Sequence, residues 1–138
     1  MAEEDLRDYL VAFLRLARSS GLDVREPGKN WVRVSDIARG SHVSLSVRRD
    51  RIQVNLNNEQ DEDRRRFRRL YAERLALETV IGSELDWEAK EGRKKTAVRV
   101  TLNEGYETGD RNRQHRWALE HMQAFQREFG KLLGGGLE

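Results

Sequence analysis

Residues 41–57 read SHVSLSVRRDRIQVNLN, and this stretch decides the fold. Apolar residues occupy every second position on both sides of a charged centre: Val43, Leu45, Val47, Ile52, Val54 and Leu56. A period of two gives a strand one apolar face and one polar face. Because the two runs are nearly contiguous, we expect an antiparallel hairpin that turns through Arg49 and Asp50. The apolar face should lie on the core.

The rest of the chain supplies helices and further strands around this hairpin. Helical spacing of apolar residues predicts helices over residues 4–19, from Asp61 to Ile81, and from Asp110 to Gly130. Strand patterns are predicted at 31–37, 85–90 and 96–102. The order α-β-β-β-α-β-β-α predicts an α+β fold, with one antiparallel sheet and helices packed on one of its faces.

No internal repeat or linker divides the chain. Residues 1–133 are therefore predicted to form a single domain. Residues 134–138 are predicted to form a flexible C-terminal end, in which Leu137 and Glu138 resemble a cloning scar.

The composition excludes several classes of protein. Charged residues make up 36% of the 138 residues, yet 26 bases nearly balance 24 acids and the net charge is +2. This balance is typical of a surface with many ion pairs rather than of a polycation that coats DNA. The absence of cysteine excludes disulfides and cysteine-based zinc sites. Without a signal peptide or an apolar run of about 20 residues, we expect a cytoplasmic protein with no membrane partner.

The arginine-rich stretch DRRRFRRL, residues 63–70, has two interpretations. It could bind phosphates, or it could be the solvated side of a helix that turns Phe67 to the core. On an ideal helical wheel the arginines spread around the circumference, and acids stand four residues from several of them. The wheel favours the solvated helix face, and nucleic-acid binding is the alternative.

Arg74 and Glu78 lie four residues apart in the apolar sector of the same wheel. We interpret them as a structural ion pair whose aliphatic stems cover apolar surface. The alternative is a polar pocket beneath the helix, because a buried pair needs further partners to offset its desolvation.

The polar face of the hairpin is the candidate ligand-binding site. A two-residue turn would place Arg48 opposite Arg51, and like charges in that position cost a hairpin up to about 1 kcal/mol. Either Asp50 or an anionic ligand would offset that cost. Amide groups and a later arginine would continue the same face, so the candidate binding residues are Arg48, Arg51, Gln53, Asn55 and Arg99.

No catalytic, metal-binding or cofactor-binding constellation is predicted. Glu88 to Lys90 has the Glu-x-Lys form of nuclease sites, but no recognisable second acid accompanies it. The three histidines lack ligand spacing, and His121 is interpreted as a satisfied residue at the core edge. The tryptophans Trp31, Trp87 and Trp117 are interpreted as core or rim aromatics, with base stacking as the alternative.

Several segments, taken together, resemble the bacterial family of domains of unknown function DUF4268. They are DYLVAFL near the start, Trp31, the hairpin, FRRLYAERLALETVIGSELDWE (67–88), RKKTAVRV (93–100) and Trp117. Within 67–88 the matching residues are Phe67, Leu70, Arg74, Leu77, Glu78, Gly82, Leu85 and Trp87. The resemblance covers about residues 6 to 130. It implies an association with DNA-linked systems, because such domains often follow a restriction-endonuclease-like domain, and it implies no chemistry.

The sequence therefore predicts a non-enzymatic binding module that takes no cofactor. Its partners would be DNA or RNA, or a nuclease or defence protein to which it is an accessory. The alternative is a protein-interaction or oligomerisation domain that does not touch nucleic acid. A metal-dependent nuclease is the third hypothesis, and the oligomeric state stays open.

Overall fold

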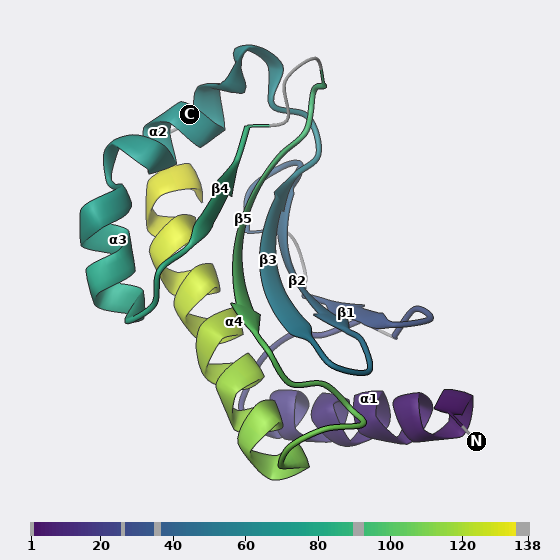
Figure 1. Ribbon diagram of the computed structural model, residues 1–138. Coiled ribbons are helices and arrows are strands. Elements are labelled where there is room, and N and C mark those ends of the chain that lie inside the picture. Colours follow the sequence, from purple (N-terminus) through teal and green to yellow (C-terminus); the bar gives the residue numbers. More distant parts are fainter. Residues whose placement is uncertain (1, 26, 35–36, 90–92, 135–138) are drawn as a thin grey trace.

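The computed structural model describes residues 2–25, 27–34, 37–89 and 93–134. Helices and strands follow one another in the predicted order, with the second predicted helix divided in two (Figure 1). The elements are α1 (Ala2–Ser19), β1 (Trp31–Arg33), β2 (Ser41–Val47), β3 (Ile52–Asn58), the 3₁₀ turn η1 (Glu62–Arg64), α2 (Arg65–Ala72), α3 (Arg74–Ile81), β4 (Asp86–Glu88), β5 (Thr96–Leu102) and α4 (Arg111–Gly134).

The five strands form one antiparallel sheet in the order β1-β2-β3-β5-β4. Val47 pairs with Ile52, which confirms the predicted hairpin register. The strands end at Val47 and Ile52, and beyond them the Arg48 amide donates to the Arg51 carbonyl over 2.8 Å. Arg48 therefore lies opposite Arg51, with Arg49 and Asp50 at the turn, as predicted. Two-residue hairpin turns favour residues with positive φ, which neither Arg49 nor Asp50 has.

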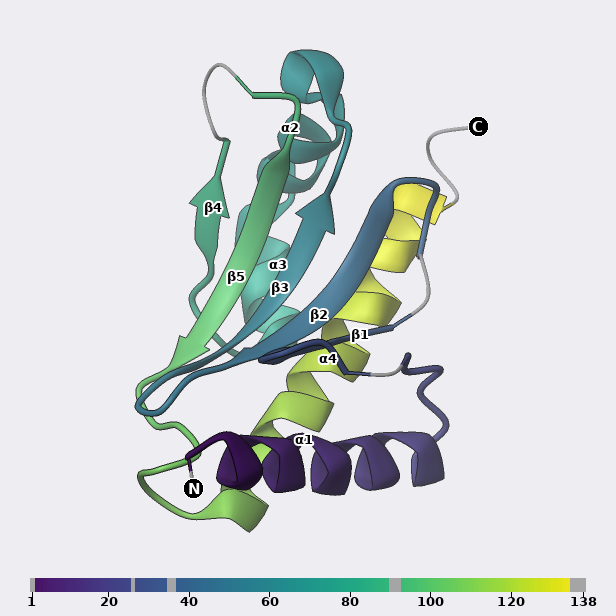
Figure 2. The same cartoon turned by 90° about the vertical axis from the view of Figure 1, so that its right-hand side faces the viewer.

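The helices cover one face of the sheet and leave the other uncovered. In Figure 1, α2, α3 and α4 lie on one side of the strands, and α1 crosses one end of the sheet. Figure 2 looks onto the opposite side, where no described helix lies over the strands and the sheet curves inward. The predicted α+β class is therefore confirmed.

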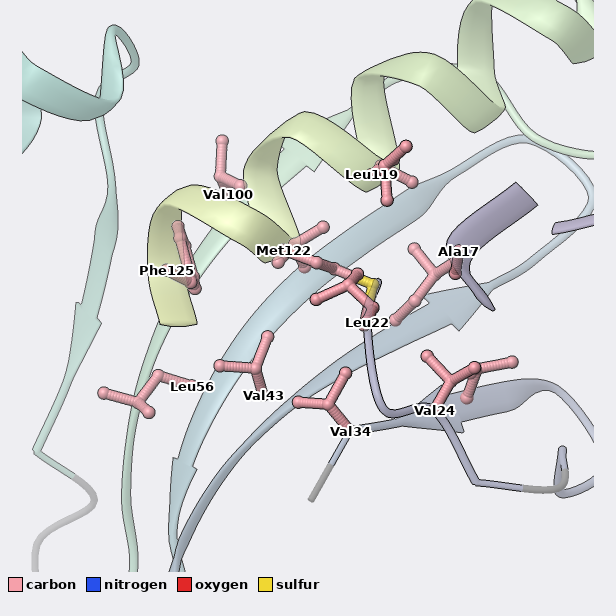
Figure 3. Packing of buried hydrophobic residues seen from close by; sticks show 14 of the residues in the cluster. Ala17, Leu22, Val24, Val34, Val43, Leu56, Val100, Leu119, Met122 and Phe125 are labelled. Atoms are coloured by element: carbon pink, nitrogen blue, oxygen red, sulfur yellow. The ribbon is translucent and has the colours of Figure 1, made fainter. Parts of the chain in front are cut away.

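The core lies between the sheet and α4, and α1 closes one end of it. Leu119, Met122 and Phe125 of α4 point toward strand residues such as Val43 and Leu56 (Figure 3). Val43 and Leu56 occupy alternate strand positions that the sequence assigned to the apolar face of the sheet. They and the three α4 residues are buried.

The predicted helix from Asp61 to Ile81 is interrupted twice. Asp63 and Arg64 have positive φ angles of 62° and 52°, and these two residues form the end of η1 before α2 begins. Glu73, with φ −103° and ψ 16°, then separates α2 from α3. Leu77, about two helical turns after the buried Leu70, is buried as well, whereas Tyr71 and Leu75, at the edge of the predicted apolar sector, are 41% and 73% exposed. The apolar sector is therefore narrower than predicted.

The last helix also departs from its prediction. It continues past Gly130 to Gly134, because Phe129 and Leu133 bury one continuous stripe against the core. Asp110 caps its start as predicted, accepting a hydrogen bond from the Asn112 amide over 3.0 Å. Of the predicted flexible end, Gly134 is helical, and 135–138 lie outside the described residues. No helix in the described ranges is long and apolar enough to cross a membrane.

Candidate functional site

The uncovered side of the sheet carries two rows of polar and aromatic side chains that run across the strands. Strand pairing aligns one row through all five strands: Arg33, Ser44, Asn55, Arg99 and Asp86. A second row lies beside it: Trp31, Ser46, Gln53 and Thr101. We call this surface, with His42 and Asn57 of the next row, the open face. The register confirms that Gln53, Asn55 and Arg99 share this face, as the alternation predicted.

Hydrogen bonds between amide and hydroxyl groups link neighbouring strands on the open face. Asn57 Nδ2 donates to Ser44 Oγ over 2.9 Å, and Asn55 Nδ2 donates to Ser46 Oγ over 3.2 Å. Gln53 Nε2 donates to Thr101 Oγ1 over 3.1 Å. These bonds hold the polar side chains in defined positions, which is the rigidity that a recognition surface needs.

The centre of the open face is less exposed than the alternation suggested. Ser44 is 8% exposed and Asn55 is 5% exposed, because the sheet curves inward and neighbouring side chains shield them. Among the described residues, Asn55 Oδ1 and Arg99 Nε are buried without a hydrogen-bond partner. Arg99 Nη2 meets Glu88 Oε2 at 2.9 Å. The centre therefore keeps hydrogen-bonding capacity that the protein itself does not use.

A hollow of about 300 Å³ lies on the β1 side of the open face. Its lining is polar except for one aromatic ring: Trp31, Arg33, His42, Ser44, Ser46, Asn57 and Glu59. Trp31 is 43% exposed, the largest such value among its tryptophans. Gly28 lies directly against the Trp31 ring, and a Cβ at this position would overlap the ring. Residue 28 must therefore be glycine for the ring to stay where it is.

The hairpin end carries charges that are not neutralised within the described part of the chain. Arg48 and Arg51 are exposed and form no ion pair with described residues, and neither does Asp50. Asp50 therefore makes no direct ion pair with either arginine, and whether its charge offsets theirs stays a hypothesis. Arg49 is paired with Glu107 at 3.7 Å.

The loop after β5 supports the same turn. The Tyr106 amide donates to the Arg48 carbonyl and the Glu107 amide to the Arg49 carbonyl, each over 3.1 Å. Gly105 lies so close to this backbone that a Cβ would overlap it. The turn is thus fixed by tertiary contacts and not by its own sequence.

Arg74 and Glu78 do not form the predicted ion pair. Arg74 is exposed, and its guanidinium lies 4.2 Å from the centre of the Tyr71 ring. Glu78 Oε2 instead accepts hydrogen bonds from the Leu85 amide over 3.0 Å and from Trp87 Nε1 over 3.2 Å. Both residues lie on α3, but Arg74 turns back to Tyr71 of α2 while Glu78 turns forward to Leu85 and Trp87.

Part of the arginine run gathers on one side of α2, contrary to the predicted spread, because Arg65, Arg68 and Arg69 stand three and four residues apart. Arg65, Arg68 and Arg69 line one hollow with Leu132, and Arg69 Nε donates to the Leu132 carbonyl over 2.8 Å. Arg66 turns the other way and hydrogen-bonds Ser41 Oγ. Phe67 is half-buried against Trp87 and Tyr71. The run thus connects α2 to α4 through Arg69 and to the start of β2 through Arg66.

The remaining candidate residues show no catalytic arrangement in the part of the chain described. Glu88 is occupied by Arg99, and Lys90 lies outside the described residues. No group of three or more potential metal ligands occurs among the residues described. His121 is satisfied as predicted, since Nδ1 lies 2.8 Å from the Trp117 carbonyl and Nε2 lies 3.0 Å from Ser83 Oγ. That the protein is not an enzyme stays a prediction.

Sequence reasoning missed the part of the open face that β1 contributes. Arg33 and His42 line its hollow but were not among the candidates, and Trp31 was interpreted chiefly as a core or rim residue. The signal was present, because Trp31 and Arg33 alternate with the buried Val32 and Val34. A strand of only three residues gave too short an alternation to separate its two faces.

Comparison with known proteins supports the resemblance and the fold. The family model described as domain of unknown function DUF4268 matches residues 7–133. Among solved structures, YbjN from E. coli, described as "a putative transcription regulator", superposes with a TM-score of 0.52 at 12% identity. The match covers 88% of this chain and 89% of that one. No curated protein matches the sequence significantly.

Proposed function

The chain belongs to the DUF4268 family, whose description assigns no activity, and from its geometry we propose that it is a non-enzymatic module that binds single-stranded nucleic acid on the open face. The observation that carries this proposal is the exposed Trp31 ring beside a rigid set of hydroxyl, amide and guanidinium groups. Aromatic stacking combined with hydrogen bonding to unpaired base edges is the common mode of single-strand recognition.

Each part of the open face has a role in this proposal. A base stacks on the solvent-facing side of Trp31, which Gly28 supports from behind. The hollow beside the ring, with Ser44, Ser46 and Asn57, offers donors and acceptors to base edges. Because these groups lie in a concave surface, a base within a stacked duplex could not reach them.

The hairpin end supplies the phosphate contacts. Arg48 and Arg51 stand at one end of the open face without a counter-ion among the described residues. An anionic ligand relieves their repulsion, and guanidinium groups bind phosphate oxygens through two parallel hydrogen bonds. The small net charge of +2 means that affinity depends on such local groups rather than on the field of the whole protein.

The structural similarity to YbjN adds little to the proposal that the ligand is nucleic acid. The description of YbjN as a transcription regulator agrees with a nucleic-acid partner, but 12% identity carries the fold alone. An accessory role beside a nuclease or in a defence system rests on the family association. In this proposal it is the setting in which the module binds nucleic acid.

Protein interaction is the second candidate, and a different surface favours it. Leu75 and Val80 on α3 are 73% and 57% exposed. Two exposed aliphatic side chains on one short helix form an apolar patch on a protein whose surface is otherwise rich in charge. This surface lies on the far side of the sheet from the open face (Figure 1). The two functions can therefore be tested separately.

Fluorescence polarisation with labelled oligonucleotides tests the proposal. We expect the full chain to bind an oligothymidylate or oligouridylate of about 15 nucleotides more tightly than a duplex of the same length, within the usual site size of about 4–16 nucleotides. Trp31→Ala should weaken binding by about 5- to 150-fold, because stacking of one base contributes about 1–3 kcal/mol. Gly28→Ala should also weaken binding, since it displaces the ring without removing it.

Tyr71→Ala is the matched control, because Tyr71 is 41% exposed and lies on α2, away from the open face. It should leave the affinity unchanged. No binding by the wild-type protein at low salt, or equal losses for Trp31→Ala and Tyr71→Ala, would remove the open face as a nucleic-acid site and leave protein interaction as the better candidate.

A further inference from the structure

Two adjoining hollows lie between α1, the segment at residues 27–30 and the hairpin end. The first measures about 550 Å³ and is lined by α1 on one side and by Pro27, Gly28 and Lys29 on the other. The second measures about 500 Å³ and lies between Lys29 and the turn formed by Arg48, Arg49 and Asp50. Lys29 lines both, so the two hollows adjoin at this residue, and we call them together the depression. In Figure 2, α1 crosses below the open face on the side toward the viewer.

The depression is strongly basic along α1. Arg7, Arg15 and Arg18 line the first hollow, and Lys29 faces them from the opposite side. No acidic residue among those that the structure describes lines this hollow, and the apolar part of its lining is Leu10, Val11 and Leu14. This composition is unlike that of the whole chain, in which 24 acids accompany 26 bases.

Three of these cations form no ion pair with any residue in the described ranges: Arg7, Arg15 and Lys29. Elsewhere, by contrast, lysines are paired, as Lys94 is with Glu62 at 3.2 Å and Lys95 with Glu59 at 3.4 Å. Gathering unpaired cations around one hollow costs free energy through their mutual repulsion, and an anion bound between them relieves it.

The depression is also continuous with the open face. Gly28, which supports the Trp31 ring, lines the first hollow, so the ring stands between that hollow and the one on the open face. Arg48 lines the second hollow at the hairpin end. A strand whose base stacks on Trp31 would therefore reach cations on both sides of Lys29 without leaving the surface.

We infer that the depression along α1 is the path of the sugar-phosphate backbone beyond the open face, with Arg7, Arg15, Arg18 and Lys29 holding successive phosphates. This inference rests on the proposed function, since it concerns the same strand, and it adds an extended site whose occupation depends on length. A short oligonucleotide fills the open face alone. A longer one continues along α1 and releases more counter-ions.

The salt dependence of binding reports the number of phosphates contacted. For single strands the slope of log K against log salt concentration is about −0.7 for each phosphate neutralised. Removing two contacts therefore makes the slope shallower by about 1.4. Between about 50 mM and about 200 mM salt, the variant should lose about sevenfold less affinity than the wild-type protein.

The test compares Arg7→Gln/Arg15→Gln with wild type, using oligothymidylates of about 5 and about 15 nucleotides, within the range of known site sizes. Both arginines are exposed on α1, so the fold is expected to survive, and circular dichroism checks this. For the longer oligonucleotide we expect weaker binding and the shallower slope. For the shorter one we expect both quantities to stay as in the wild-type protein.

The matched control is Arg68→Gln/Arg116→Gln. It removes the same charge from exposed positions on α2 and α4, on the other side of the sheet. An equal change of slope in control and test variant, or an equal change for both lengths, would overturn the backbone path while leaving the open face standing. Failure of the wild-type protein to bind either oligonucleotide would overturn the proposed function itself, so the two outcomes are distinguishable.

Discussion

At the scale of single residues, Glu78 shows how a side chain that looks like half of an ion pair can serve another purpose. Its carboxylate joins the end of α3 to β4 by accepting from the Leu85 amide and the Trp87 indole. Gly82, with φ 84°, ends the helix between them in a left-handed conformation. Glu78, Gly82, Leu85 and Trp87 also carried the family resemblance, and in the structure they form one connected turn.

This arrangement predicts unequal effects for the two members of the expected pair. Glu78→Ala should destabilise the protein by about 2–3 kcal/mol, because it removes a charged acceptor from two partly buried donors. Arg74→Ala should cost less than about 1 kcal/mol, since it loses an exposed cation–π contact with the Tyr71 ring and an exposed hydrogen bond to the Tyr71 carbonyl. Urea denaturation followed by circular dichroism measures both. Equal losses in the two variants would restore the ion-pair interpretation.

At the scale of elements, α3 is held on the core by one side only. Leu77 of α3 is 5% exposed, whereas Leu75, two residues earlier, is 73% exposed. Leu77 follows the buried Leu70 by about two helical turns and so lies on the same side, while Leu75 stands at the edge of the predicted apolar sector. The short helix therefore contributes one anchored leucine and presents an apolar outer side to solvent.

Two leucine variants test this orientation. Leu77→Ala should destabilise by about 2–5 kcal/mol, as buried leucines do when truncated. Leu75→Ala should change the free energy of unfolding by less than about 0.5 kcal/mol, as expected for a surface position. The same urea titration compares them. A large loss for Leu75→Ala would contradict this orientation and show that a second protein or another copy covers this side of α3.

At the scale of the whole molecule, His115 links α1 to α4 and makes stability depend on pH. Its ring packs against Tyr9, with ring centres 4.4 Å apart, and against Phe13 at 5.7 Å. Burial, assisted by the nearby Arg111, lowers the pKa of His115 to about 4. In the unfolded chain the same imidazole takes up a proton near pH 6.5. Protons therefore bind the unfolded state first as the pH falls.

The consequence is a loss of stability on the acid side. The contribution of neutral His115 is complete above about pH 6.5 and is lost progressively as the pH falls toward 4. From pH 7 to pH 5 the free energy of unfolding should fall by up to about 2 kcal/mol from this group. His115→Leu should show a smaller fall over the same interval, measured by urea midpoints at the two pH values. An identical fall in both proteins would show that His115 is not the titrating group.

Local patterns determined the elements and their pairing. The alternation in residues 41–57 predicted both strands and their register, and with it the shared face of Gln53, Asn55 and Arg99. This worked because side chains in a strand have a period of two, so only one register buries every apolar residue. Helical spacing of apolar residues located α1, and the Asp110 cap located the start of α4. Both signals depend only on residues that are close together in the sequence.

Only the tertiary structure decided where the elements bend and which groups meet. The break at Glu73, the burial of Ser44 and Asn55, the position of Trp31 on Gly28 and the row of cations along α1 opposite Lys29 all depend on contacts between distant segments. An ideal wheel or a strand alternation treats each element as straight and isolated. Packing against α4 and the inward curvature of the sheet stabilise local conformations that these patterns do not contain. The sequence by itself therefore determined the α+β architecture and one polar face, while the concave surface and its basic extension arise only when the chain is folded.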